Sequence, residues 1–278
     1  MVNKNGGIVM IQKLNPILEE ATRKNRGVCA FTATNFEILT AIIEIAEKRG
    51  ESVIIKHSAT FEENVPLKYM GPVIIELANK AKVDVCPMLD HCKDTEYIKQ
   101  GLKMGFKAVM YDGAFLPYDE NVKKGKEIVS LAKSADANIE ASFGVVGGHN
   151  GEVSIITNVD ELMKYIKEVD IDALAPSVGN THSAKETAKI DFDLLKQISE
   201  KTNMPLVLHG AGNLPKEDIR KAIECGVRKV NYLSNAGVKE VKDYINTAND
   251  FSFAKMTNVM VNAIKKDIEE AMATVAMK

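Results

Sequence analysis

The chain of 278 residues contains no tryptophan, and aromatic residues make up only 6% of it. A surface that stacks sugars or bases needs exposed aromatic rings, so this scarcity argues weakly against both kinds of binding. Cysteine is also sparse and forms no CxxC pair, so neither a disulfide framework nor a thiolate zinc site is indicated. We expect reduced thiols at the four cysteines, which are Cys29, Cys86, Cys92 and Cys225.

An excess of charge is missing too, because 36 Lys and Arg residues face 38 Asp and Glu residues, giving a formal net charge of −2. Proteins that bind nucleic-acid phosphates or lie on membrane surfaces usually carry a clear basic excess. The apolar patch near the start, at 8–11, is too short for a signal segment or a membrane span. We therefore expect a cytoplasmic protein without a nucleic-acid or membrane partner.

Short runs rich in β-branched residues recur along the chain, and an amphipathic stretch with helical spacing follows each of them. Strands that alternate with helices pair in parallel through right-handed crossovers. Eight such units favour a closed (β/α)8 barrel over a doubly wound sheet, which typically has fewer strands. The expected strands are 27–32, 52–58, 83–90, 106–112, 137–142, 171–177, 204–209 and 227–233.

No repeat or low-complexity linker divides the chain, so we expect one domain over residues 1–278. Its fold class is α/β, a single TIM barrel with an extra N-terminal helix before residue 27 and a C-terminal helix at 254–275. Local signals agree, since Gly50 is placed to end one helix and Pro215 to begin another.

Reactive residues of such barrels lie at the carboxyl ends of the strands. Four of the five histidines fall at or just past those ends, although a single one, such as His57, is more often an ordinary hydrogen-bonded residue. His91, His182 and His209 follow strands that share the barrel mouth, and three imidazoles with an open fourth position make a catalytic zinc site. Asp90 precedes the first of them and is a candidate general acid/base, the alternative being a capping or ligand-orienting carboxylate.

Small residues follow two of the strand ends, in SVGN (177–180) and LHGAGN (208–213). Backbone N–H groups are free to bind a phosphate there, and the last strand adds the polar side chains of Asn231 and Ser234. The loops after the seventh and eighth strands are the usual phosphate site of these barrels. Each glycine alone is explained equally well by the needs of a turn.

Seven segments of the chain resemble, in order and spacing, the zinc-dependent class II fructose-bisphosphate and tagatose-bisphosphate aldolases. The similarity covers nearly the whole chain from about residue 10, and the segments are AFTATN, PMLDHC, MYDGAFLPYDENV, EASFGVVGG, SVGNTH, LVLHGAG and KVNYLS. The resemblance implies a TIM-barrel lyase with one catalytic zinc ion, and it leaves a requirement for a monovalent cation open.

The resemblance also implies roles for individual residues. Asp90 takes the proton from the C4 hydroxyl during cleavage, and zinc, instead of a lysine Schiff base, stabilises the negative charge left when the C3–C4 bond breaks. The implied zinc ligands are His91, His182 and His209. The residues implied to hold the dihydroxyacetone phosphate half are Ser58, Gly179, Gly210 and Asn231, with Gly212 and Ser234 beside them.

Several positions depart from the family pattern, mostly in the parts that grip the substrate. Ser142 stands in place of a glutamate near a second metal position, and Gly212 removes a hydroxyl from the phosphate site. The family's DPR arginine, which meets the distal phosphate, is missing, because no arginine follows Arg228. Lys255 and Lys56 are candidate replacements. The other departures are Cys92, Asn150 with Glu152 two residues later, Ser183 and Asn235.

We therefore predict reversible cleavage of a ketose phosphate or bisphosphate to dihydroxyacetone phosphate and an aldehyde. One alternative is an aldolase that acts on another phosphorylated or acidic ketose without a second phosphate. The other is a non-catalytic metal-binding barrel, which the complete histidine set and Asp90 disfavour. Apolar residues of the trailing helix predict a homodimer or homotetramer, unless they pack over the barrel floor: Met256, Val259, Val261, Ile264, Ile268 and Met272.

Overall fold

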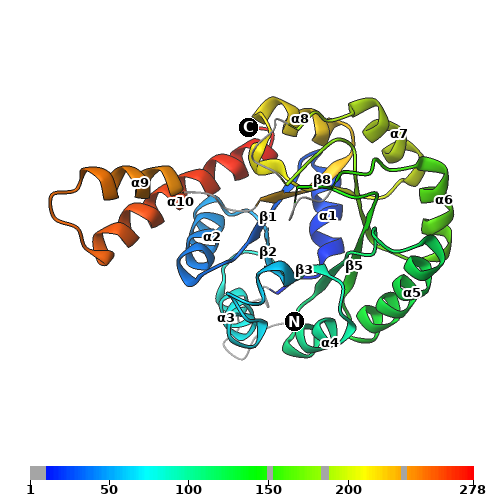
Figure 1. Cartoon of the computed structure of the whole chain (residues 1–278), viewed down its shortest axis with the longest axis horizontal. Coiled ribbons are helices and arrows are strands. Elements are labelled where there is room, and N and C mark those ends of the chain that lie inside the picture. The colour runs from blue at the N-terminus through cyan, green and yellow to red at the C-terminus, as the bar shows by residue number, and fades with distance from the viewer. Residues whose placement is uncertain (1–10, 149–152, 183–187, 233–236) are drawn as a thin grey trace.

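The computed structural model describes residues 11–148, 153–182, 188–232 and 237–278. Eight parallel strands close into a barrel in chain order, with β8 paired to β1, so the predicted (β/α)8 TIM barrel is confirmed (Figure 1). The strands are β1 (Val28–Thr32), β2 (Val53–Ser58), β3 (Val85–Cys92), β4 (Ala108–Tyr111), β5 (Asn138–Phe143), β6 (Ala173–Pro176), β7 (Leu206–Leu208) and β8 (Val227–Tyr232).

Helices surround the barrel, and their ends follow the capping signals of the sequence. The Asn35 side chain accepts a hydrogen bond from the Ile38 N–H at the start of α2, and Gly50 ends that helix in the left-handed region. The helices are α1 (Leu14–Arg23), α2 (Phe36–Arg49), α3 (Leu67–Lys80), α4 (Thr95–Met104), α5 (Tyr118–Ser134), α6 (Val159–Glu168), α7 (Phe192–Thr202), α8 (Lys216–Glu224), α9 (Val238–Thr247) and α10 (Phe253–Val275), with 3-10 turns η1 (Ala59–Phe61) and η2 (Ala211–Asn213).

Helix α1 is the predicted N-terminal helix, and it closes the floor of the barrel. Its Asn15 hydrogen-bonds Asn138 at the start of β5 and Asp172 just before β6, which places the helix at the amino ends of the strands. The apolar face packs on inward-facing residues of the barrel wall. Because α1 occupies the floor, the free end of the barrel is the carboxyl end. The buried residues of this face are Leu14, Ile17, Leu18 and Ala21.

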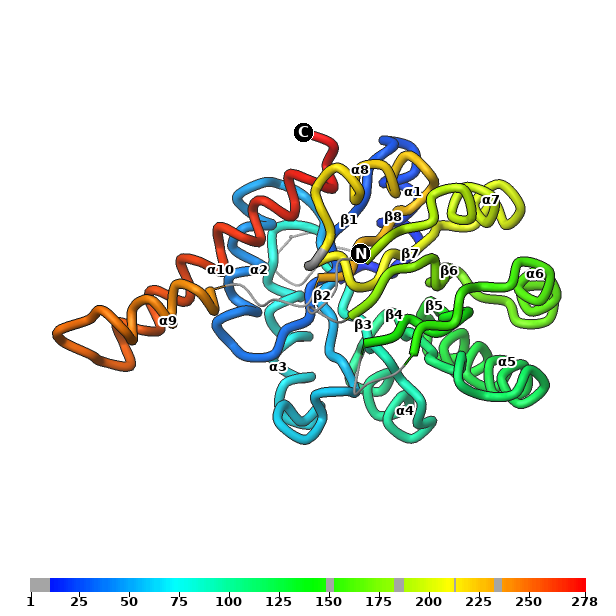
Figure 2. The backbone as a smooth tube through the Cα atoms, turned by 45° about the horizontal axis from the view of Figure 1, so that its top comes forward, coloured from blue at the N-terminus to red at the C-terminus, as the bar shows by residue number. Residues whose placement is uncertain are grey.

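Helix α10 contains the predicted C-terminal helix and has two different halves. Its second half packs against α2, α8 and β1, with Ile264, Ile268 and Met272 buried. Its first half projects from the barrel together with α9 (Figures 1 and 2). We call these two segments, residues 238–263, the helical arm. Among the described residues, no helix is long and apolar enough to cross a membrane.

The packing of α1 predicts a large loss of stability when its buried face is truncated. Leu18 is 0% exposed, so Leu18→Ala leaves a cavity and should lower the free energy of unfolding by about 2–5 kcal/mol in urea denaturation. The control is Leu116→Ala, at a leucine that is 38% exposed, which should change the free energy by about 0.5 kcal/mol or less. Equal losses in the two variants would contradict the role of α1 as the barrel floor.

Candidate active site

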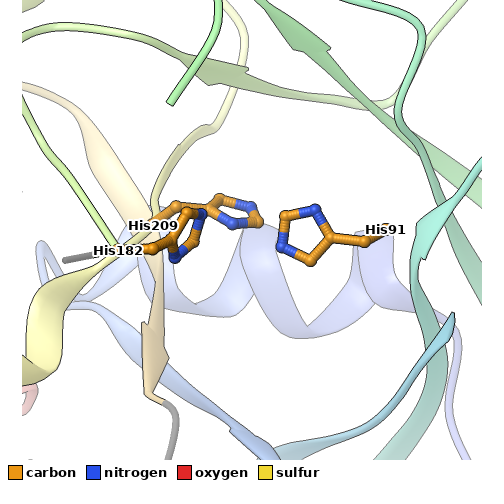
Figure 3. Close-up of side chains that lie close together, drawn as sticks. All are labelled: His91, His182 and His209. Atoms are coloured by element: carbon orange, nitrogen blue, oxygen red, sulfur yellow. The ribbon is translucent and has the colours of Figure 1, made fainter. Parts of the chain in front are cut away.

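Three histidine side chains meet at the carboxyl end of the barrel (Figure 3). His91 belongs to β3, His182 lies in the segment after β6, and His209 directly follows β7. One ring nitrogen from each lies within 4.8 Å of the others, and the ring centroids are 5.1, 5.3 and 5.6 Å apart. The rings lie edge to face. Three imidazoles in this arrangement suit a zinc ion, which binds histidine nitrogen and leaves a fourth position for substrate.

An irregularity in β3 puts His91 into this cluster. In a regular strand, neighbouring side chains point to opposite faces, so Asp90 and His91 would be separated by the barrel wall. Here the register of β3 against β4 shifts between Leu89 and Cys92, and His91 has a φ of +53°. A residue other than glycine in this region costs on the order of 1–3 kcal/mol. The distortion lets both side chains face the barrel mouth, where they line one cavity.

A carboxylate directly after β4 orients His91. Asp112 accepts a hydrogen bond from His91 Nδ1 at 3.1 Å and a second from the Ser142 hydroxyl at 2.9 Å. Burial alone would raise the pKa of Asp112, but the hydrogen bond and charge of His91 lower it to about 2. Metal-binding histidines commonly hydrogen-bond a carboxylate through the ring nitrogen that does not face the metal, so this bond suits His91 to bind a metal through Nε2.

A second carboxylate, on β5, orients His209. The Nε2 atom of His209 lies 3.2 Å from Glu140 Oε1 and 2.8 Å from the Asn231 amide nitrogen. These contacts leave Nδ1 of His209 for a metal. Burial and the nearby charge of His91 lower the pKa of His209 well below its ordinary range. Because a metal binds the neutral imidazole, this shift favours the form of His209 that acts as a ligand.

Two buried ion pairs lie under the histidines. Lys56 Nζ is 2.6 Å from Asp90 Oδ2, and Lys229 Nζ is 2.9 Å from Glu140 Oε2. All four side chains are at most 4% exposed. Burial on its own would raise the pKa of Asp90, but the charges of Lys56 and of the neighbouring histidines bring it below its ordinary range. These charges favour the ionised form of Asp90, which is the form that accepts a proton.

The pair of Lys56 and Asp90 lines a cavity of about 390 Å³. It is lined by Asp90 and the three histidines, so the predicted acid/base and the predicted metal ligands share one space. Four of the predicted substrate-binding residues line it as well, namely Ser58, Gly210, Gly212 and Asn231. The cavity continues between the loop after β7 and the second half of α10.

Two of the predicted phosphate-binding glycines sit where backbones approach closely. A Cβ on Gly210 would lie 2.2 Å from the Thr181 carbonyl oxygen, so the loop after β7 packs directly on the segment that carries His182. A Cβ on Gly179 would lie 2.1 Å from the Lys189 carbonyl oxygen, and Gly179 is not among the described residues that line the cavity. Its contact with substrate stays a prediction.

Other residues singled out in the sequence fall elsewhere. His57 hydrogen-bonds the Tyr97 hydroxyl and the Val65 carbonyl oxygen, so it has the ordinary role of a buried histidine. Lys255 pairs with Asp250 on the helical arm and does not line the cavity, whereas Lys56 does. The predictions that lie outside the described residues concern Ser234, Asn150, Glu152, Ser183 and Asn235.

The sequence did not reveal which groups hold the carboxylates and imidazoles in place. Asp112 and Glu140 are polar residues at the ends of expected strands, but nothing in the sequence pairs them with particular histidines. Lys56 was predicted only as a candidate replacement for the missing arginine. One signal was available for Lys56: it alternates with Ile54 and Ser58 on β2, which places it on the inward face of the barrel.

Comparison with known proteins agrees with this geometry. The family model described as class II fructose-bisphosphate aldolase matches residues 12–278. A sulfofructosephosphate aldolase from Alkalicoccus urumqiensis is 32% identical over 222 residues, 77% of each chain. The structure of the YdjI aldolase from Escherichia coli K12 has a TM-score of 0.85 at 25% identity, covering 96% of this chain and 97% of that one.

A second solved structure, a putative fructose-1,6-bisphosphate aldolase from Coccidioides immitis, has a TM-score of 0.83 at 26% identity, covering 95% of this chain and 96% of that one. The family model takes in every strand of the barrel and the whole histidine cluster, and the curated relative exceeds 30% identity over most of both chains. The chain therefore belongs to the class II fructose-bisphosphate aldolase family.

Proposed function

We propose that this aldolase is zinc-dependent and cleaves a ketose phosphate reversibly to dihydroxyacetone phosphate and an aldehyde. The observation that carries the proposal is the shared cavity, in which three converging imidazoles lie beside one buried carboxylate that pairs with Lys56. His91, His182 and His209 would hold the zinc ion. When bound, zinc would polarise the C2 carbonyl of the substrate and stabilise the negative charge that develops on its oxygen.

Asp90 would carry the proton in this reaction. Its carboxylate accepts the proton of the C4 hydroxyl, the C3–C4 bond breaks, and C4 leaves as an aldehyde while the bonding electrons stay with the C2–C3 fragment. In the reverse direction the same carboxyl group returns the proton to the aldehyde oxygen. Asp90 suits this role because it lines the cavity next to His91 and because Oδ1 has no hydrogen-bond partner among the described residues.

The loops after β7 and β8 would bind the phosphate of the dihydroxyacetone phosphate half. Gly210 and Gly212 line the cavity at the end of β7 and have no side chain of their own to stand between their backbone N–H groups and a phosphate. Asn231 on β8 and Ser58 on β2 add polar groups to the same wall. Local dipoles supply this anion recognition, which is consistent with the small net charge of the chain.

The far end of the substrate is where we expect a difference from fructose 1,6-bisphosphate. No arginine follows Arg228, and Lys255 is paired with Asp250 outside the cavity. The relative from Alkalicoccus urumqiensis is named for a sulfofructose phosphate. Both observations support a ketose 1-phosphate whose far end does not carry a second phosphate.

The metal and proton roles can be separated with two variants. Asp90→Asn removes the proton acceptor but no zinc ligand, so it should lower kcat for cleavage by about 10²–10⁴-fold and keep about one zinc ion per chain. His182→Ala removes a ligand, so zinc content and cleavage should fall together, as they should in wild-type protein treated with a chelator. Zinc is measured by elemental analysis. Cleavage that persists in the zinc-free protein would refute the metal mechanism.

The substrate prediction is tested by comparing kcat/KM for fructose 1,6-bisphosphate, fructose 1-phosphate and a sulfofructose phosphate. A charge-assisted phosphate contact contributes about 1.5–3 kcal/mol, and this chain has lost the arginine that would make it. We therefore expect the bisphosphate to have no advantage over the other two, with release of dihydroxyacetone phosphate as the measurement. A clear preference for the bisphosphate would contradict this expectation.

We also infer a homodimer or homotetramer that forms through the helical arm. Helix α9 buries no residue in its own chain, and the arm exposes the large apolar side chains of Ile245 and Phe253. Apolar patches of this kind mark interaction sites. Ile245→Asp with Phe253→Asp should lower the sedimentation coefficient, whereas Tyr69→Asp, at an exposed residue of α3, should not. An unchanged coefficient in the arm variant would exclude association through the arm.

A further inference from the structure

Lys56 lies in an unusual place for a lysine. It is 3% exposed on β2 and stands beside Met88 in the register of β2 and β3, one inward-facing position below Asp90. The side chain extends toward the barrel mouth, and its ammonium group donates a hydrogen bond of 2.6 Å to Asp90 Oδ2. The neighbouring position above it is Ser58, which pairs with Asp90 in the register. Lys56 and Asp90 both line the cavity.

The contact fixes one oxygen of the carboxylate and not the other. Lys56 is the one side chain among the described residues that hydrogen-bonds the Asp90 carboxylate. Oδ1 is buried and has no hydrogen-bond partner there. An unsatisfied buried acceptor is costly, so Oδ1 is suited to a donor that arrives with the substrate. The other buried lysine, Lys229, is paired with Glu140 and is not among the cavity-lining residues, so it offers no replacement.

We propose that Lys56 is a positioning residue for Asp90, which holds Oδ2 so that Oδ1 is the oxygen that exchanges a proton with the substrate hydroxyl. This inference rests on the proposed function of Asp90. Proton transfer requires the carboxylate to lie within hydrogen-bond reach of the hydroxyl, and small displacements are costly. A short, charge-assisted hydrogen bond restricts rotation of the carboxylate and compensates a charge buried away from water.

A positioning role differs from two other roles that a lysine in this cavity would have. A lysine that gripped a substrate phosphate would act mainly on KM, because it would bind ground state and transition state alike. A lysine that formed a Schiff base would be trapped on substrate by borohydride. A lysine that acts through Asp90 instead lowers kcat for cleavage and has no effect once Asp90 is disabled.

The test compares Lys56→Gln, which loses the charge, with Lys56→Arg, which keeps it. Lys265→Met is the matched control, because it removes a lysine paired with Glu44 away from the cavity. Each variant is assayed for zinc content and for kcat and KM of cleavage. Each is also assayed for solvent deuterium exchange into the hydroxymethyl carbon of dihydroxyacetone phosphate. No aldehyde takes part in that reaction, so it does not need the proton transfer that we assign to Asp90.

We expect Lys56→Gln to keep its zinc and its deuterium exchange, while kcat for cleavage falls at least about 10-fold with little change in KM. Lys56→Arg should recover part of that loss, and the control should match wild type. In the Asp90→Asn background, Lys56→Gln should change the residual rate by less than about 2-fold. If Lys56→Gln does not fold, the Lys56→Arg variant and the charge-neutral pair Lys56→Met with Asp90→Asn carry the comparison.

Retention of kcat in Lys56→Gln, a rise confined to KM, borohydride trapping on Lys56, or equal losses of exchange and cleavage would each overturn the inference. Retained kcat, a change confined to KM and equal losses leave the proposed function standing, because wild-type cleavage and exchange would still be observed. Borohydride trapping on Lys56 would count against the proposed metal mechanism as well, because it would show a Schiff base. Absence of both reactions in zinc-loaded wild-type protein would refute the proposed function, and the inference with it.

Discussion

The active site depends on one departure from regular strand geometry, at the end of β3. A pleated strand separates neighbouring side chains by the thickness of the sheet, and the proposed chemistry needs two neighbours, Asp90 and His91, on the same side. The register shift after Leu89 and the left-handed backbone of His91 provide that arrangement. The local strain is supported by the ordered barrel around it and by the bond from His91 to Asp112, which fixes the displaced ring.

Two buried lysines compensate the charges of two buried carboxylates beneath the histidines. Inward-facing side chains of a barrel lie in layers along its axis. Lys56 extends from the layer below to pair with Asp90, and Lys229 pairs in the same way with Glu140. The opposite charges of each pair cancel within the protein, so none of these four buried groups is left as an isolated charge. A divalent metal on the three histidines would then bring the positive charge that an anionic sugar phosphate meets. The barrel supplies a neutral scaffold, and anion recognition stays local to its mouth.

The sequence was sufficient for the architecture and for the identity of the clustered histidines, because both follow from where strands end. Strand alternation predicted the barrel, and the position of His182 and His209 after their strands predicted convergence. The partners of these residues could not be predicted in the same way. Whether Glu140 meets His209 depends on how far each side chain reaches between layers, and the β3 irregularity at His91 has no signal in a period-two pattern. At Gly179 the backbone of Lys189 approaches too closely for a side chain, and the sequence could not distinguish this requirement from phosphate binding.

The partners of the acidic residues support the proposal that Asp90 is the proton acceptor. Glu140 faces Lys229 with one oxygen and His209 with the other. Asp112 accepts from His91 and from Ser142, a serine where related aldolases are expected to carry a glutamate. A serine at this position carries no charge and gives Asp112 a second hydrogen-bond donor. Both carboxylate oxygens of Asp112 therefore accept a hydrogen bond. Asp90 alone among the three combines a place on the cavity wall with an oxygen that has neither a hydrogen bond nor an ion pair within the described residues. A proton acceptor in this site needs a carboxylate oxygen that is not already bonded to another group. Among these three acidic residues, Asp90 has such an oxygen on the cavity wall.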